Sequence, residues 1–200
     1  MFEASVQALR EGYMINDEAI NKYMELLAAL DISGGQNNLF WTTMFYTKLE
    51  EFDDAAEGYV KIKPWVEKLA KPEYNKVFVP VHVQEGKHWF LITVDFDEKT
   101  IRSLDSLSTG GGRERQRRKV MQWVKEEWNT STRWEGEFCS EDWSSQQSSV
   151  PTQTNGVDCG IFTCMFAAFE SNRQELNFCQ GDMGKMRSRM AWSILHGRLT

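Results

Sequence analysis

One polar segment delivers a cysteine to the start of the most apolar run in the chain. Residues 151–160 are rich in turn-forming side chains and carry Cys159, and residues 161–169 are almost wholly apolar. A cysteine at the start of a helix feels the positive end of the helix dipole, which favours a nucleophilic thiolate. Gln153 lies six residues earlier and can donate a hydrogen bond to an oxyanion. The alternative is a buried structural cysteine in a core helix.

A cysteine nucleophile needs a base close by, and the chain offers three histidines. His88 opens an apolar strand beside a turn, so we expect its ring to project from the rim of the sheet. His82 falls inside the preceding strand, where a packed or edge histidine is expected. His196 falls at a helix C-terminus, where the dipole favours a cation and a capping role is expected. His88 is therefore the candidate base.

The base in turn needs an acceptor that orients its ring. Asp105 directly follows a strand expected at 100–104, and a tight turn at 97–99 joins that strand to the one opened by His88. Counting outward from the turn brings the two side chains together across the strand pair. An aspartate that only forms a turn is the alternative. The predicted nucleophile, base, orienting group and oxyanion donor are Cys159, His88, Asp105 and Gln153, the last acting with the backbone N–H of Cys159.

The cysteines do not indicate a metal site or a disulfide framework. They contain no C-x-x-C pair, and they lie at Cys139, Cys159, Cys164 and Cys179. Two histidines, His82 and His88, could share a metal with a cysteine, but no third ligand follows at a recognised spacing. We expect reduced thiols, no metal and no cofactor.

The periodicity of apolar residues predicts the elements that position these groups. A helix capped by Asn16 or Asp17 ends at 33–35, and a second begins at Thr42 or Thr43. Pro64 suits the first turn of a further short helix. Strands are expected at 77–83, 88–96 and 100–104, with turns at 84–87 and 97–99, and one more strand is expected near Trp143. One further helix follows the glycine hinge at 110–112 and has Val120, Met121, Val124 and Trp128 on one face. Helices at about 159–169 and 182–196 complete an α+β fold, with flanking helices around a central sheet.

A basic run lies on the helix that we expect after a glycine hinge at 110–112. Its members are Arg113, Arg115, Arg117, Arg118 and Lys119. Such a run can contact an acidic partner, but the interpretation we favour is a solvated helix surface.

Composition narrows the class of protein. A chain of 200 residues suits a single domain, and a formal net charge of -6 argues against general nucleic-acid binding. No apolar run is long enough to span a membrane, and no signal-peptide pattern opens the chain. We therefore expect a soluble, intracellular protein that forms one domain over residues 1–200.

Short recognisable motifs are spread over nearly the whole chain, at 15–21, 45–49, 79–82, 88–89, 94–96, 104–106, 155–160, 176–178 and 189–196. Together they resemble the catalytic domain of the SUMO-specific cysteine proteases. Each motif is weak alone, but their order is specific. The resemblance implies a papain-like cysteine protease fold, with a central mixed or antiparallel sheet and a buried helix that carries the nucleophile.

The resemblance also implies roles for individual residues. It carries His88, Asp105, Cys159 and Gln153 onto the catalytic positions of the family, in agreement with the reasoning above. Trp89 would roof a narrow tunnel that admits only residues without a Cβ, although an ordinary strand-core aromatic is the alternative. The opposite wall, usually tryptophan in the family, is Met14 here, which gives a softer wall. Asp17 would contact the surface of the modifier, or cap a helix.

The implied activity is cleavage after the C-terminal Gly-Gly of SUMO, from lysine isopeptides or precursors, through a thioester on Cys159. The implied partner is SUMO or a related modifier and its conjugates, bound by a monomer in the nucleus, at the nuclear envelope or in the cytoplasm. A protease for another ubiquitin-like modifier is the main alternative. A thioester acetyltransferase and a non-catalytic modifier-binding module are the others.

Overall fold

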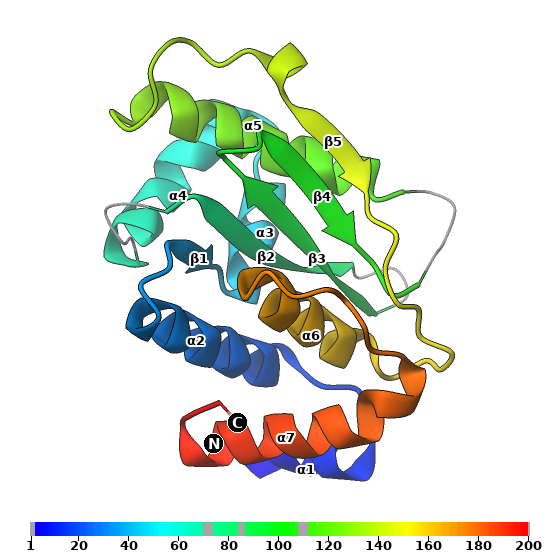
Figure 1. The fold of residues 1–200 in the computed structure, drawn as a ribbon. Helices are drawn as coiled ribbons and strands as arrows, with labels where there is room; N and C mark the ends of the chain where they lie inside the picture. Colours follow the sequence, from blue (N-terminus) through cyan, green and yellow to red (C-terminus); the bar gives the residue numbers. More distant parts are fainter. Residues whose placement is uncertain (1–2, 70–73, 84–86, 108–111, 200) are drawn as a thin grey trace.

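A computed structural model of the chain describes residues 3–69, 74–83, 87–107 and 112–199. The elements follow the chain in the order α1 (Glu3–Glu11), α2 (Asp17–Ser33), β1 (Asn38–Phe40), α3 (Thr43–Glu50), α4 (Ala55–Leu69), β2 (Lys76–Val83), β3 (His88–Asp95), β4 (Thr100–Leu104), α5 (Glu114–Thr130), η1 (Ser140–Asp142), β5 (Ser144–Gln147), α6 (Cys159–Ser171), η2 (Gln180–Asp182) and α7 (Met183–His196). Figure 1 shows a twisted sheet with helices on both faces.

The sheet has five strands in the spatial order β1-β2-β3-β4-β5. The central strands β2, β3 and β4 form an antiparallel meander, as the sequence predicts. The edge strands β1 and β5 run parallel to β2 and β4, so the whole sheet is mixed. The register of β3 with β4 fixes the relative position of every residue at their shared end, which is where the site lies.

Helices cover both faces of the sheet, and this explains why β2 and β3 are largely apolar and buried. One core joins the sheet to α1, α2, α6 and α7, and it receives Trp89 and Leu91 from β3. The other core joins the sheet to α3, α4 and α5, and it receives Phe90 and Ile92 from the same strand. Adjacent residues thus point to opposite faces. In Figure 1, α2 and α6 lie against one face, while α1 and α7 form an outer layer beyond α2.

The helix α6 is almost completely enclosed by the first of these cores. Its buried side chains include Ile161, Phe162, Phe166 and Ala167, each essentially without exposed surface. Three of its phenylalanine rings, Phe162, Phe166 and Phe169, pack on Phe178 of the following loop. The helix is therefore a rigid support, which fixes the position of the residue at its N-terminus.

One local prediction is confirmed, and one is wrong. Asn16 is the N-cap of α2, since its Oδ1 accepts the Ala19 N–H at 3.1 Å. Pro64, expected in a first turn, lies instead inside the longer helix α4. Pro64 and Val60 are both exposed, so the carbonyl that the proline leaves without a helical donor is on the solvent side of the helix. Buried Tyr59 and Ile62 hold the other side of α4 against the core.

Other predictions were incomplete. The strand expected near Trp143 begins one residue later, and α1 and β1 were not predicted. β1 has only three residues, too few to show a period. The turn expected at 84–87 and the glycine hinge at 110–112 fall mainly on residues outside those described.

Candidate active site

The proposed nucleophile lies where the sequence places it. Cys159 is the first residue of α6 and is 3% exposed. The helix begins directly behind it, since the Phe162 N–H donates to the carbonyl of Asp158 at 2.9 Å. A second cysteine on the same helix, Cys164, is fully enclosed, and burial holds the pKa of its thiol far above the usual range. Only one of the two cysteines of α6 is therefore placed to react.

His88 and Asp105 meet at the shared end of β3 and β4. His88 Nε2 lies 2.6 Å from Asp105 Oδ1, and both residues are buried. The strand register pairs Leu91 with Leu104, so one further step places Asp105 opposite Phe90. His88 lies two residues along from Phe90, on the same face of the strand. The predicted contact is present, and it runs diagonally rather than straight across.

The other side of the His88 ring faces the nucleophile. Burial alone would lower the pKa of His88, but the hydrogen bonds to Asp105 and Cys159 and the negative charge of these two groups raise it to about 9. The imidazole is therefore protonated at neutral pH. Since Asp105 takes Nε2, the nitrogen available to the thiol is Nδ1. The structure thus assembles the thiol, the imidazole and the carboxylate that the sequence selected.

Asp105 is held by three donors. Besides His88, its Oδ1 accepts the Leu107 N–H at 2.9 Å, and its Oδ2 accepts Nε of Arg113 at 2.6 Å. Although burial opposes its charge, these contacts hold the pKa of Asp105 below its usual value. The guanidinium of Arg113 also lies over the ring of Phe90, 4.8 Å from its centroid. The carboxylate is thus fixed in orientation and kept ionised.

Arg113 therefore corrects the interpretation of the basic run as a solvated surface. Arg113 is only partly buried, whereas Arg117 is buried, and the Arg117 guanidinium donates to Ser103 Oγ at 2.7 Å and to Ser145 Oγ at 3.2 Å. Arg115 and Arg118 do lie on the surface. The arginines of one basic run therefore lie in two kinds of environment, and only the three-dimensional structure shows which of them contact buried groups and which face solvent.

Gln153 lies beside the end of β4 that carries Asp105. The Gln153 N–H donates to the carbonyl of Ser106 at 2.9 Å, and the Ser106 hydroxyl donates to Gln153 Oε1 at 2.6 Å. Gln153 Nε2 donates to the carbonyl of Asn155, also at 2.6 Å. The amide is thus buried and held at both ends. Ser106 was not predicted, because a serine after an aspartate carries no distinctive signal.

A buried ion pair stands directly before the nucleophile. Asp158 Oδ1 accepts Nε of Arg187 at 2.7 Å, and its Oδ2 accepts the side-chain amides of Asn155 and Gln180, each at 2.7 Å. Although burial opposes it, this set of donors lowers the pKa of Asp158. Arg187 also donates to the carbonyl of Tyr13 at 2.9 Å. One side chain of α7 thus joins the loop of Cys159 to the segment that carries Met14.

A groove of about 430 Å³ brings together the three residues predicted to contact substrate. Its lining includes Met14, Asp17, Met44, His82 and Trp89. Trp89 is 9% exposed and packs on His82 with 4.4 Å between ring centroids, while Met14 is 42% exposed. Asn16, not Asp17, caps α2, so the exposed carboxylate of Asp17 remains open to the groove. Trp89, which directly follows His88 in β3, therefore forms part of the wall of this groove.

The remaining histidines take structural positions. Burial lowers the pKa of His82, which packs against Trp89 as a strand histidine. His196 ends α7, where its Nδ1 lies 2.8 Å from the Trp192 carbonyl and its ring stacks on Trp192.

Within the described part of the chain, no group of three or more acidic, histidine or cysteine side chains is arranged to hold a metal ion. Among the same residues, no helix is both long and apolar enough to cross a membrane.

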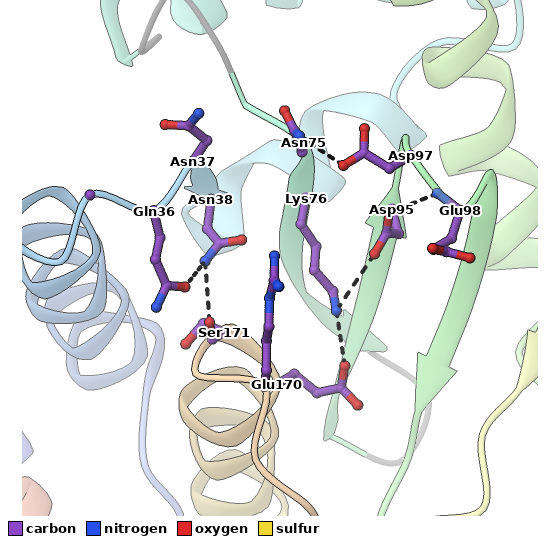
Figure 2. Close-up of a pocket in the computed structure, with 12 residues that line it drawn as sticks. Gln36, Asn37, Asn38, Asn75, Lys76, Asp95, Asp97, Glu98, Glu170 and Ser171 are labelled. Carbon is purple, nitrogen blue, oxygen red and sulfur yellow. Dashed lines mark hydrogen bonds and ion pairs between the residues drawn. The ribbon is translucent and has the colours of Figure 1, made fainter.

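A second cavity, of about 720 Å³, lies at the opposite end of the strands (Figure 2). Lys76 at the start of β2 reaches Glu170 at 3.3 Å and Asp95 at 3.8 Å, as the dashed lines in Figure 2 show. Glu170 also binds the guanidinium of Arg102. These contacts tie the C-terminal end of α6 to the sheet, so this polar cluster has a clear structural role.

Comparisons with known proteins agree on one relationship. Residues 13–198 match the C-terminal catalytic domain of the Ulp1 protease family. Human sentrin-specific protease 2 is 32% identical over 198 residues, which cover 97% of this chain and 32% of that protein. The sentrin-specific protease of Caenorhabditis elegans is 31% identical over 200 residues, covering 94% of this chain and 26% of that protein. The chain thus spans about a third or less of the length of these relatives.

Solved structures show the same fold. The SUMO protease Ulp1, with its catalytic cysteine oxidised to a sulfinic acid, superposes with a TM-score of 0.80 and 27% identity, over 97% of this chain and 83% of that one. The Ulp1 protease domain in complex with Smt3, the yeast ortholog of SUMO, gives a TM-score of 0.79 and 26% identity, over 96% and 81%. The papain-like fold with a mixed sheet and flanking helices is therefore confirmed.

Proposed function

The chain belongs to the Ulp1 protease family, and we propose that it cleaves the bond after the C-terminal Gly-Gly of SUMO, in lysine isopeptides and in SUMO precursors. The arrangement of Cys159, His88 and Asp105 carries this proposal. A thiol at a helix N-terminus, a protonated imidazole and a fixed carboxylate are the groups that acyl transfer by a cysteine requires.

The chemistry follows from these positions in two stages. The Cys159 thiolate attacks the glycine carbonyl carbon, and the oxyanion is held by Gln153 and the backbone N–H of Cys159. The C–N bond then breaks, His88 gives its proton to the departing amine, and a thioester remains. In the second stage His88 takes a proton from water, and the water oxygen attacks the thioester carbon. The C–S bond then breaks with the Cys159 thiolate as leaving group, and the glycine carboxylic acid gives its proton to solvent. The thiolate–imidazolium pair is restored.

The groove beside His88 supplies the selection for Gly-Gly. An extended C-terminal tail that lies between Trp89 and Met14 must pass between two apolar side chains, where residues with a Cβ have less room. The exposed carboxylate of Asp17 at the edge of the groove is positioned to contact the body of the modifier. Because Met14 is flexible and partly exposed, it allows more variation in the tail than a rigid ring would. This observation favours a second candidate, a protease for another ubiquitin-like modifier.

Cleavage assays test the proposal directly. The wild-type chain should release the C-terminal extension of a SUMO precursor and free SUMO from a lysine conjugate. Cys159→Ala should abolish both reactions. Cys164→Ala, which changes the other cysteine of α6, is the matched control and should retain them. A wild-type chain that cleaves neither substrate, although folded, would contradict the proposed function.

The proposal extends to the form in which the protein works. We expect residues 1–200 to act as a single catalytic domain and as a monomer, without binding nucleic acid and without a cofactor. The nucleus or nuclear envelope is the compartment that the relationship to SUMO proteases favours, with the cytoplasm as the alternative.

A further inference from the structure

Ser106 connects the end of β4 to the oxyanion donor of the proposed mechanism. It is 1% exposed, and its hydroxyl donates to Gln153 Oε1 at 2.6 Å. The backbone of the two residues is also joined, because the Gln153 N–H donates to the Ser106 carbonyl at 2.9 Å. These two residues, 47 positions apart in the chain, are therefore coupled through two hydrogen bonds.

The orientation of the Gln153 amide follows from its two partners. The carbonyl of Asn155 can only accept, so it fixes Nε2 on its own side at 2.6 Å. The Ser106 hydroxyl then meets Oε1 on the other side. A primary amide has two N–H bonds, and one remains after the bond to Asn155 is made. The bond to Asn155 thus leaves a second N–H that can donate to an oxyanion.

Donation by Ser106 also affects the strength of that N–H. A hydrogen bond accepted at the amide oxygen polarises the amide group and makes its N–H a stronger donor. The bond lies in a buried site, where both partners are shielded from water. Loss of the hydroxyl would leave Oε1 without this donor and free the amide plane to turn.

We propose that Ser106 is a positioning residue, which fixes the amide plane of Gln153 for oxyanion binding. This inference rests on the proposed acyl-transfer function. Two consecutive residues after β4 then have related roles: Asp105 orients the base His88 through its carboxylate, and Ser106 orients the oxyanion donor Gln153 through its hydroxyl. The end of this strand therefore positions both the base and the oxyanion donor.

A test must separate the oxyanion donor from the thiol–imidazole pair. Acylation of Cys159 by 4-nitrophenyl acetate builds an oxyanion, whereas alkylation by iodoacetamide does not. Ser106→Ala should lower the acylation rate by about tenfold or more, with alkylation unchanged. Ser193→Ala, which changes another buried serine on α7, is the control and should alter neither rate. Equal losses in acylation and alkylation with Ser106→Ala would overturn the inference.

Two further comparisons keep the test decisive. Ser106→Thr and Ser106→Val have the same shape and differ in the hydroxyl, so threonine should acylate about tenfold faster than valine. In a Gln153→Ala background, Ser106→Ala should have no further effect, because the residue acts through Gln153. Full additivity of the two losses would overturn the inference. Since 4-nitrophenyl acetate requires no modifier, these outcomes stand apart from whether SUMO is the substrate.

Discussion

Arg113 donates its Nε–H to Asp105 Oδ2 at 2.6 Å, on the oxygen that His88 does not use. Arg113 itself sits in the left-handed region at φ 44, just before α5, and its guanidinium covers Phe90. The carboxylate is therefore held on both oxygens, by the base that it orients and by the arginine that immediately precedes α5.

Arg113→Ala should lower kcat by roughly tenfold with little change in KM, because a freed Asp105 no longer holds the imidazole in its reactive orientation. Iodoacetamide alkylation of Cys159 should slow as well, since that reaction depends on the same imidazole. Arg118→Ala, which removes an arginine with a 70% exposed side chain from α5, is the control. Unchanged alkylation in the Arg113 variant would show that the contact has no catalytic role.

The pH dependence of turnover should report the protonation of His88. Its pKa is raised from 6.5 to about 9, so the imidazolium that protonates the amine is present at neutral pH and is lost as pH rises through about 9. We expect kcat/KM to fall above that pH. Asp105→Asn removes the charge that favours the imidazolium and leaves burial to oppose it, so the alkaline limb should move to lower pH by about one unit or more.

The matched control for this measurement is Asp97→Asn, which changes an exposed aspartate in the turn between β3 and β4. Its profile should coincide with that of the wild type. Identical alkaline limbs in wild type and Asp105→Asn would contradict the assignment of this limb to His88.

Arg187 and Asp158 should contribute strongly to stability. Both are buried, and removal of the arginine leaves a buried carboxylate with only amide donors. Arg187→Met should lower the free energy of unfolding by about 3 kcal/mol or more. Arg189→Met, at an exposed position of the same helix, should change it by less than about 0.5 kcal/mol. Urea denaturation followed by tryptophan fluorescence measures both free energies of unfolding. A loss for Arg187→Met as small as that expected for Arg189→Met would show that the buried pair contributes little to stability.

Gly160 has a steric reason to be glycine. A Cβ at this position would lie 2.5 Å from Cγ1 and 3.0 Å from Cδ1 of Ile15, a buried side chain next to Met14. Helix propensity favours alanine by about 1 kcal/mol, but overpacking typically costs about 1–3 kcal/mol, so we expect Gly160→Ala to be destabilising. Thermal denaturation should show a lower Tm. Gly184→Ala in α7, where a Cβ meets nothing within 4 Å, should raise the Tm or leave it unchanged.

The meander and the nucleophile helix were predictable because their signals are local. Continuous apolar strands, turn residues between them and a polar segment before an apolar helix all appear within short windows of sequence. The pairing of His88 with Asp105 followed from counting along one hairpin. These predictions needed no contact between distant parts of the chain.

The groups that hold the site were not predictable, because their partners are remote in sequence. Ser106 has its role because its hydroxyl donates to Gln153, and Arg187 has its role because it donates to Asp158 and to the Tyr13 carbonyl. Arg113 and Arg118 look equivalent in the basic run, yet one supports Asp105 and the other lies in solvent. Burial of a polar side chain depends on what the fold places opposite it, and composition does not record that.

The most direct test of the account is labelling by modifiers that carry a C-terminal electrophile in place of the scissile bond. SUMO with this group should form a covalent adduct with Cys159 of the wild-type chain, while ubiquitin should not, and Cys159→Ala should form none. Intact mass and peptide mapping identify the adduct. Preferential labelling by ubiquitin or another modifier would contradict the claim that this chain is a SUMO protease. The absence of labelling by SUMO, when iodoacetamide still alkylates Cys159, would contradict it as well.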